Sequence, residues 1–222
     1  MTRGQLCFDI GANVGHVADA LLRLGARVVA VEPQGECIRI LQRRYKNNPD
    51  IILVWAAADE GDGTRALHVS DHDKISSMST SWMEAVTKSR RFSDFRWTRS
   101  EDVKTVSLDS LTKKYGTASF CRIDVEGYEL NVVRGLSKPI PLISFEFTPE
   151  YIETTLAVIE HLEALGQYSY NYSLDGSIKL ASDKWLSTSE IIRQLSLFTS
   201  ESKTGNVYAR LPALPDTNHT FS

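Results

Sequence analysis

The stretch "LCFDIGANVGHVADALLRLGARVVAVEP", residues 6–33, decides the fold class. The apolar run Leu6–Ile10 predicts a strand, helical spacing of apolar residues over Val14–Leu24 predicts a helix, and Arg27–Val31 predicts a second strand. The glycine turn "DIGANVG" joins the first strand to the helix, and Glu32 follows the second strand. A strand, a glycine turn, a helix and a strand in this order are typical of α/β proteins that bind a nucleotide-like cofactor.

The rest of the chain continues the alternation. Buried strands are predicted at "IILVWAAA" (51–58), "SFCRIDV" (119–125) and "PLISFEF" (141–147), because unbroken apolar runs fit parallel strands that are covered on both faces. The predicted helices are Glu36–Tyr45, Leu108–Tyr115, 128–136, Thr154–Leu165 and Glu190–Phe198. "YSYNYSL" (168–174) and "NVYARL" (206–211) predict an antiparallel finish. We therefore expect a three-layer α/β fold with a mostly parallel sheet.

Composition limits the class of protein. The chain has 222 residues and a net charge of -3, which fits one large globular domain and disfavours a non-specific nucleic-acid binder. Its three cysteines form no CxxC pair, so we expect neither a disulfide framework nor a zinc site. "MTRGQL" at the N-terminus lacks an apolar signal segment, and the apolar runs are too short to cross a bilayer. We expect a cytoplasmic protein without a membrane partner.

One segment, residues 71–102, departs from the regular alternation. It is polar, only Ser81–Lys88 is predicted to be helical, and "VKTVSL" (103–108) is predicted to be a strand after it. The run "KSRRFSDFRWTR" (88–99) mixes arginine with aromatic residues, which can bind RNA, hold an anionic small substrate or form a lid. Because the chain is acidic overall, we expect a lid or substrate-binding insertion within a single domain.

The glycine turn and its flanking acids indicate which cofactor binds. A dinucleotide fingerprint would read GxGxxG, whereas here Asn13 replaces the middle glycine. Asp9 would repel a pyrophosphate but attract an ammonium group such as that of a methionine moiety. Glu32 is placed to accept hydrogen bonds from ribose hydroxyls. Together these residues suit S-adenosylmethionine better than NAD, although a ligand-free turn and a solvated carboxylate are the alternatives.

Asp59 follows the third predicted strand. A carboxylate there can accept a hydrogen bond from an adenine amino group, and the small residues Ala57 and Ala58 leave room for a flat ring. An aspartate that only forms a turn is an equally good interpretation.

Candidate catalytic acids follow the next two strands. In "RIDVEGYEL" (122–130) the predicted strand ends with Asp124 and Glu126, just before Gly127, and Glu146 lies between two phenylalanines in "ISFEFTP". Any of these carboxylates could be a general base, and His72 in the polar segment is a weaker candidate. Alternatively, Asp124 and Glu146 could hold Mg²⁺ or Mn²⁺, and the sequence does not separate these roles.

Four stretches taken together resemble the FkbM-type methyltransferases. They are "FDIGANVGHVADALLRLGARVVAVEP", "WAAADEGDG", "VKTVSLDSL" and "CRIDVEGYELNVVRGL", and the likeness covers roughly residues 6–147. The resemblance implies a class I methyltransferase fold, with a seven-stranded sheet and an antiparallel C-terminal strand. It also implies methylation of a hydroxyl oxygen, often on a sugar or secondary metabolite, with S-adenosylmethionine as the methyl donor.

The resemblance also implies a set of site residues. Asp9, Gly11, Asn13, Gly15 and Glu32 match positions that contact the cofactor, and Asp124 lies beside its methionine part. We add their neighbours Ala12 and Pro33 to the expected contacts. The acceptor is expected to be a small molecule or a glycan. An NAD(P)-dependent oxidoreductase and a non-catalytic adenosine-binding module are the alternative functions.

Overall fold

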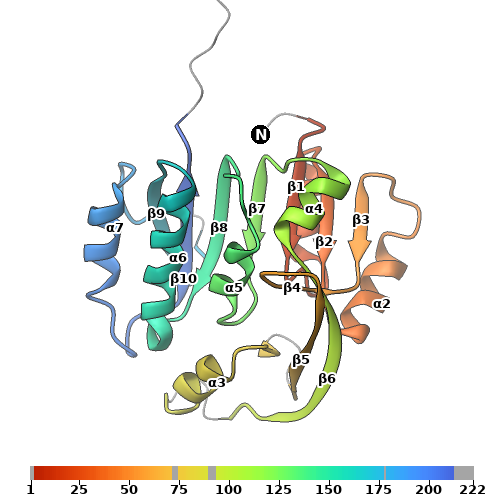
Figure 1. The fold of residues 1–222 in the computed structure, drawn as a ribbon, viewed down its shortest axis with the longest axis horizontal. Coiled ribbons are helices and arrows are strands. Elements are labelled where there is room, and N and C mark those ends of the chain that lie inside the picture. The colour runs from red at the N-terminus through yellow and green to blue at the C-terminus, as the bar shows by residue number, and fades with distance from the viewer. Residues whose placement is uncertain (1–2, 72–74, 90–93, 178, 213–222) are drawn as a thin grey trace, which may run out of the picture.

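The computed structural model describes residues 3–71, 75–89, 94–177 and 179–212, and a seven-stranded sheet forms its centre (Figure 1). Across the sheet the strands are β3 (Ile51–Val54), β2 (Arg27–Val31), β1 (Leu6–Ile10), β7 (Phe120–Ile123), β8 (Leu142–Phe147), β10 (Gly205–Arg210) and β9 (Ser169–Leu174). β10 is antiparallel to both of its neighbours, while the strands from β3 to β8 run parallel. The expected mostly parallel sheet with an antiparallel C-terminal strand is confirmed.

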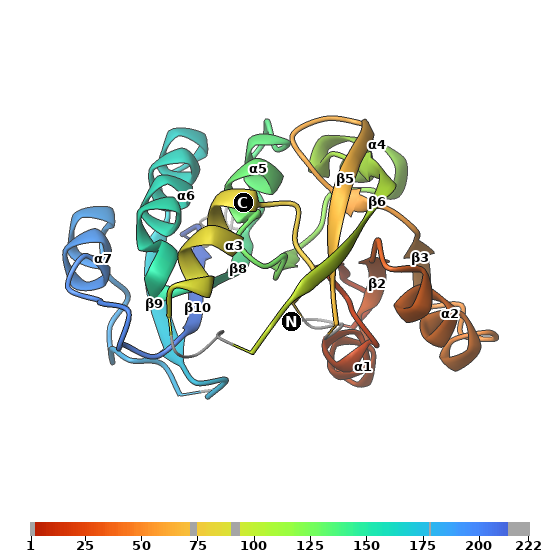
Figure 2. The same cartoon turned by 90° about the horizontal axis from the view of Figure 1, so that it is seen from below.

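Helices cover both faces of this sheet (Figure 2). On one face lie α1 (His16–Arg23) and α2 (Gly35–Arg44), and on the other lie α4 (Leu108–Tyr115), α5 (Glu129–Arg134) and α6 (Ile152–Leu165), with α7 (Thr188–Leu195) beside α6. Successive residues of β1 pack against helices on opposite faces of the sheet. Cys7 packs in the hydrophobic cluster with α1 and α2, and Phe8 packs in the cluster with α4 and α5. Within the described residues, no helix combines the length and apolarity needed to span a membrane.

The expected strand "IILVWAAA" is divided into two, so that prediction was wrong. β3 ends at Val54, the next side chain, Trp55, is 61% exposed, and the N–H of Ala56 donates to the carbonyl of Val54 in a tight turn. The chain thereby leaves the main sheet, and β4 (Ala57–Ala58) pairs with β6 instead.

A small second sheet lies beyond the carboxyl ends of the parallel strands (Figure 1). Its order is β4–β6–β5, with β5 at Gly63–Ser70 and β6 at Trp97–Val106. β6 pairs along β5 from Thr105 back to Trp97. Residues 97–102 were expected to be irregular but are part of this strand, so that prediction was wrong. The helix expected at Ser81–Lys88 is confirmed as α3 (Thr80–Thr87), and a 3₁₀ helix at Pro149–Tyr151 precedes α6. We call residues 63–106 the insertion.

Candidate functional site

A cavity of about 310 Å³ lies at the carboxyl ends of β1, β2 and β7. This is the edge of a parallel sheet at which ligands of open α/β folds bind. Many residues predicted from the sequence line the cavity: Gly11, Ala12, Asn13, Glu32, Pro33, Ala57, Ala58, Asp124, Glu126 and Glu146.

The glycine turn owes its shape to contacts within the protein. Gly11 has φ +79°, and a Cβ there would lie 1.9 Å from the carbonyl oxygen of Asp124. Glycine at this position therefore allows the end of β1 to approach the end of β7. Asn13 also has a positive φ of 48°, and Gly15, with φ 91°, precedes α1 and accepts a hydrogen bond from the Tyr45 hydroxyl at its carbonyl.

Glu32 is held firmly at the end of β2. Its side chain is buried, and its two carboxylate oxygens accept hydrogen bonds from the backbone N–H groups of Asn13 and Gln34, each at 2.8 Å. Burial raises the pKa of Glu32, and these hydrogen bonds partly oppose the rise. The side-chain amide of Gln34 donates a third hydrogen bond at 3.3 Å, and since a carboxylate offers about four acceptor positions, Glu32 retains capacity for a ribose hydroxyl. The residues present therefore fit the adenosine part of S-adenosylmethionine.

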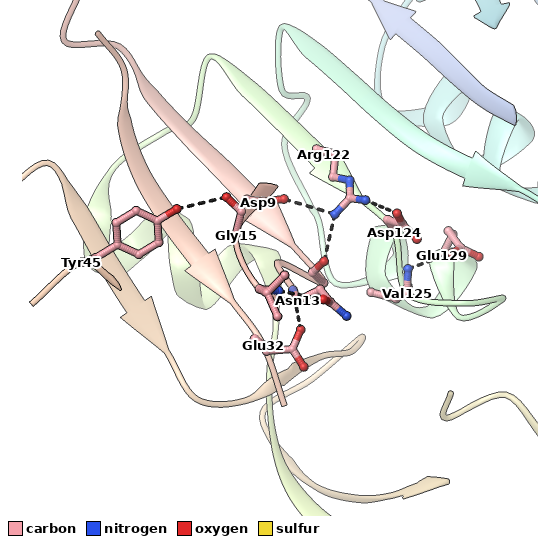
Figure 3. Close-up of polar contacts among 11 residues, drawn as sticks. Asp9, Asn13, Gly15, Glu32, Tyr45, Arg122, Asp124, Val125 and Glu129 are labelled. Atoms are coloured by element: carbon pink, nitrogen blue, oxygen red, sulfur yellow. Dashed lines mark hydrogen bonds and ion pairs between the residues drawn. The ribbon is translucent and has the colours of Figure 1, made fainter. Parts of the chain in front are cut away.

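Arg122 on β7 connects the two sides of this site (Figure 3). Its Nη1 lies 3.3 Å from the carboxylate of Asp9 and 2.9 Å from the carbonyl oxygen of Gly11, while its Nη2 pairs with the carboxylate of Asp124. Arg122 and Asp124 line the cavity, whereas Asp9 is fully buried and lies outside the lining. The structure thus places Asp9 behind Arg122 rather than in the cavity wall.

Other predicted site residues also lie elsewhere. Asp59 is outside the lining, where its carboxylate pairs with Arg65 at 2.9 Å and accepts a hydrogen bond from the Tyr128 hydroxyl at 3.1 Å. Gly15 shapes the start of α1 without lining the cavity. His72 falls outside the described residues.

Three carboxyl groups converge on the cavity. Asp124, Glu126 and Glu146 each offer an oxygen within 4.8 Å of the others. Burial raises the pKa of both Glu126 and Glu146 well above the ordinary value, and the neighbouring charge of Asp124 raises both further. Carboxylates at this spacing repel one another, so the pair of glutamates binds protons more readily than isolated side chains do.

The loop that carries two of these acids has an unusual backbone. Glu126 has φ 54° and Gly127 has φ 84°, and both lie in the left-handed region. One carboxylate oxygen of Glu129 accepts hydrogen bonds from the N–H groups of Val125 and Gly127, and the Ser77 hydroxyl donates to the carbonyl of Glu126 at 2.6 Å. Buried contacts from two directions therefore hold Glu126 at the cavity.

The sequence matches a family model described as "Methyltransferase FkbM domain" over residues 9–172, which is most of the chain. The protein belongs to the FkbM methyltransferase family. It is accordingly an S-adenosylmethionine-dependent methyltransferase, and the oxidoreductase alternative is not supported. No curated protein matches this chain in sequence.

Solved structures agree on the fold of this FkbM methyltransferase. The precorrin-6y C5,15-methyltransferase of Geobacter metallireducens GS-15 has a TM-score of 0.50 and 12% identity, covering 94% of this chain and 81% of its own. The putative tRNA (m1A22) methyltransferase Sp1610 of Streptococcus pneumoniae has a TM-score of 0.50 and 6% identity, covering 98% of this chain and 68% of its own. At such identities the likeness shows the class I methyltransferase fold alone.

The insertion closes one side of the FkbM site. Leu67, Ser76 and Met78 line the cavity. The Ser76 hydroxyl donates to the side-chain oxygen of Gln34 at 2.9 Å, and the Gln34 amide donates to Glu32 at 3.3 Å. The insertion is therefore hydrogen-bonded to the residues that surround the predicted ribose position.

Sequence reasoning missed several lining residues of the FkbM site. They are His16, Val17, Val31, Gln34, Leu67, Ser76, Met78, Arg122 and Val125. Arg122 left a usable signal, since it is a cation inside the apolar strand "FCRIDV", two residues before an acid. A buried arginine requires a carboxylate partner, and this requirement could have directed attention to it. The insertion residues left no comparable pattern.

Proposed function

We propose that this protein transfers a methyl group from S-adenosylmethionine to a hydroxyl oxygen of a small molecule or glycan. The observation that carries the proposal is the convergence of Asp124, Glu126 and Glu146 on the cavity that also contains Glu32. A hydroxyl acceptor must lose a proton as the new bond forms, and a cluster of carboxyl groups supplies a proton acceptor.

The residues that would hold the cofactor divide by the part they face. All of them line the cavity. Glu32 would bind the ribose, Ala57 and Ala58 would lie beside the adenine, and Gly11, Asn13 and Asp124 would hold the methionine part. The bound cofactor supplies an electrophilic methyl group on its sulfonium.

Glu146 is the base that we propose. It lines the cavity, and burial raises its pKa, so its carboxylate takes up a proton more readily than that of an exposed glutamate, as a general base must. Asp124 is paired with Arg122 and is better placed to orient than to accept the proton. Glu126 offers an oxygen within 4.8 Å of one of Glu146, and its charge raises the pKa of Glu146.

The insertion forms the acceptor side of the site in this proposal. Leu67, Ser76 and Met78 exclude water from the cavity, and the acceptor enters beside them. In this proposal the chain is a single domain, and the insertion is its lid. We also propose that the protein acts in the cytoplasm and has no nucleic-acid partner.

Binding calorimetry tests the cofactor assignment. We expect the protein to bind S-adenosylhomocysteine in the micromolar range, roughly -8 kcal/mol, and not to bind NADH. Glu32→Ala should weaken this binding by about 1.5–3 kcal/mol, because ribose hydroxyls lose a charged acceptor. Glu36→Ala, at an exposed position in the first turn of α2, is the matched control and should bind normally. Equal affinity in the wild type and Glu32→Ala would refute the ribose assignment.

An acceptor screen separates catalysis from mere binding. Methyl transfer from labelled S-adenosylmethionine is measured against hydroxylated metabolites, sugars, amines and RNA. Transfer to a hydroxyl supports the proposal. Transfer only to nitrogen or RNA would overturn the acceptor class, and binding without transfer to any acceptor would favour a non-catalytic module.

A further inference from the structure

Arg122 contacts two separate parts of the cavity wall. One nitrogen, Nη1, donates to the carbonyl oxygen of Gly11 in the turn after β1, and the other, Nη2, pairs with Asp124 after β7 (Figure 3). Its side chain is only 18% exposed, so solvent weakens these contacts little. A single guanidinium therefore fixes the distance between the two loops.

Asp9 holds the same guanidinium from behind. Its carboxylate is fully buried and lies 3.3 Å from Nη1, which also donates to Gly11. The planar fork of arginine can satisfy partners on both nitrogens at once, whereas the single ammonium of lysine cannot reproduce this arrangement. The three partners thus define the orientation of the fork.

We propose that Arg122 is a positioning residue for the methionine half of the cofactor site. It holds the Gly11 carbonyl and the Asp124 carboxylate in the one arrangement that binds the amino-acid part of S-adenosylmethionine. This inference rests on the proposed function. It assigns Asp9 an indirect role, as the anchor of Arg122, in place of the direct ammonium contact expected from the sequence.

Two ligands that differ by the amino-acid part provide the test. S-adenosylhomocysteine carries it, and 5′-methylthioadenosine lacks it while keeping the adenosine and the sulfur. We expect Arg122→Met to weaken S-adenosylhomocysteine at least about tenfold and to change 5′-methylthioadenosine less than about twofold. Arg122→Lys should recover part of the lost affinity, because it restores the charge without the fork. Both affinities are measured by calorimetry.

Folding is controlled separately. Arg122→Met leaves the buried Asp9 without its cation, so the double variant Asp9→Asn/Arg122→Met removes the unpaired charge. It should show the same selective loss of S-adenosylhomocysteine. Arg134→Met, which removes an exposed arginine at the end of α5, should change neither affinity.

The outcomes are distinguishable. A selective loss of S-adenosylhomocysteine in the Arg122 variants supports the inference. An unchanged affinity, or an equal loss for both ligands in the folded double variant, would overturn it while leaving the proposed function intact. Failure of the wild-type protein to bind S-adenosylhomocysteine would overturn the proposed function and this inference with it.

Discussion

Glu146 and Glu126 are side chains whose pKa is raised strongly by burial and by the charge of Asp124. Glu146→Gln keeps the size of the side chain but removes the proton acceptor, so turnover should fall by about 10²–10⁴-fold with S-adenosylhomocysteine binding nearly intact. Glu126→Gln should have a smaller effect, because Glu126 acts on Glu146 only through its charge. The measurement is turnover on any acceptor found by the screen.

Asp124→Asn completes this series and is assayed with and without chelator. Full activity in both Glu146→Gln and Asp124→Asn would remove these two carboxylates from the mechanism. Loss of wild-type activity with chelator, restored by Mg²⁺ or Mn²⁺, would contradict direct proton transfer to Glu146 and assign the three acids to a cation instead.

Gly11 provides a second test at the scale of a residue. A Cβ at this position would meet the backbone oxygen of Asp124 at 1.9 Å, and backbone cannot move aside as a flexible side chain can. Gly11→Ala should therefore lower the free energy of unfolding by at least about 1–3 kcal/mol, the range for strained backbone, and should also abolish cofactor binding.

Gly61→Ala is the matched control, because nothing lies within 4 Å of a Cβ there. It should stay within about 0.5 kcal/mol of the wild type. Thermal unfolding of both variants and the wild type measures these differences in stability. A Gly11→Ala protein as stable as Gly61→Ala would show that the two loops are not in close contact.

At the scale of elements, Trp82 attaches α3 to the rest of the protein, together with the buried Val86 and a hydrogen bond between the hydroxyls of Ser81 and Tyr151. The Trp82 side chain is fully buried, its Nε1 donates to the Thr148 hydroxyl at 3.2 Å, and its atoms lie where a Cβ of Gly127 would be. The loop that carries Glu126 and the insertion are thus packed directly against each other.

Trp82→Ala should release α3 more than it destabilises the main sheet. We expect faster protease cleavage within residues 75–97, with S-adenosylhomocysteine plus an acceptor slowing cleavage of the wild type more than that of the variant. Glu84→Ala, an exposed position on the same helix, should be cleaved like the wild type. Equal cleavage of Trp82→Ala and Glu84→Ala would exclude Trp82 as the main attachment of α3.

The elements also show where sequence reasoning succeeds. Local patterns predicted the strands of the main sheet and the helices on its faces, because the central parallel strands are apolar runs that can be recognised without their neighbours. The division of "IILVWAAA" was not predictable in this way. Ala57 and Ala58 continue the apolar run of β3, and they leave the main sheet through the turn after Val54 and their pairing with β6, which is distant in sequence.

In the candidate site, too, local sequence patterns predict some residues, while others depend on contacts between distant segments. Residues that directly follow core strands, such as Glu32 and Asp124, could be predicted because the fold places strand ends together. Ser76 and Met78 could not, because they reach the cavity through the tertiary packing of the insertion.

At the scale of the whole molecule, several buried acids make stability depend on pH. Burial raises the pKa of Asp9, Glu32, Glu126, Glu129 and Glu146. A group whose pKa is higher in the folded state binds more protons there than in the unfolded state. The free energy of unfolding therefore falls as pH rises through this range.

Glu129 provides the clearest case. Burial raises its pKa from 4.5 to about 7, so its contribution is complete below pH 4.5 and is lost by about pH 7. Glu129→Gln should reduce the pH-dependent loss between these values by up to about 3 kcal/mol, because glutamine does not titrate. The glutamine oxygen can still accept the N–H groups of Val125 and Gly127, so the loop is expected to keep its structure. Glu153→Gln, at an exposed position in the first turn of α6, is the control. Denaturant unfolding at several pH values measures the slope, and an unchanged slope in Glu129→Gln would contradict the assignment.

The position of β10 has a consequence for biosynthesis. β10 (Gly205–Arg210) lies between β8 and β9, although β8 ends at Phe147. While the ribosome is still translating residues 148–204, the nascent chain can already contain the parallel strands β1, β2, β3, β7 and β8, but the outer edge of β8 has no strand to pair with. An open strand edge invites pairing with other chains. This edge of β8 therefore stays open in the newly made protein until β10 pairs with it or a chaperone shields it.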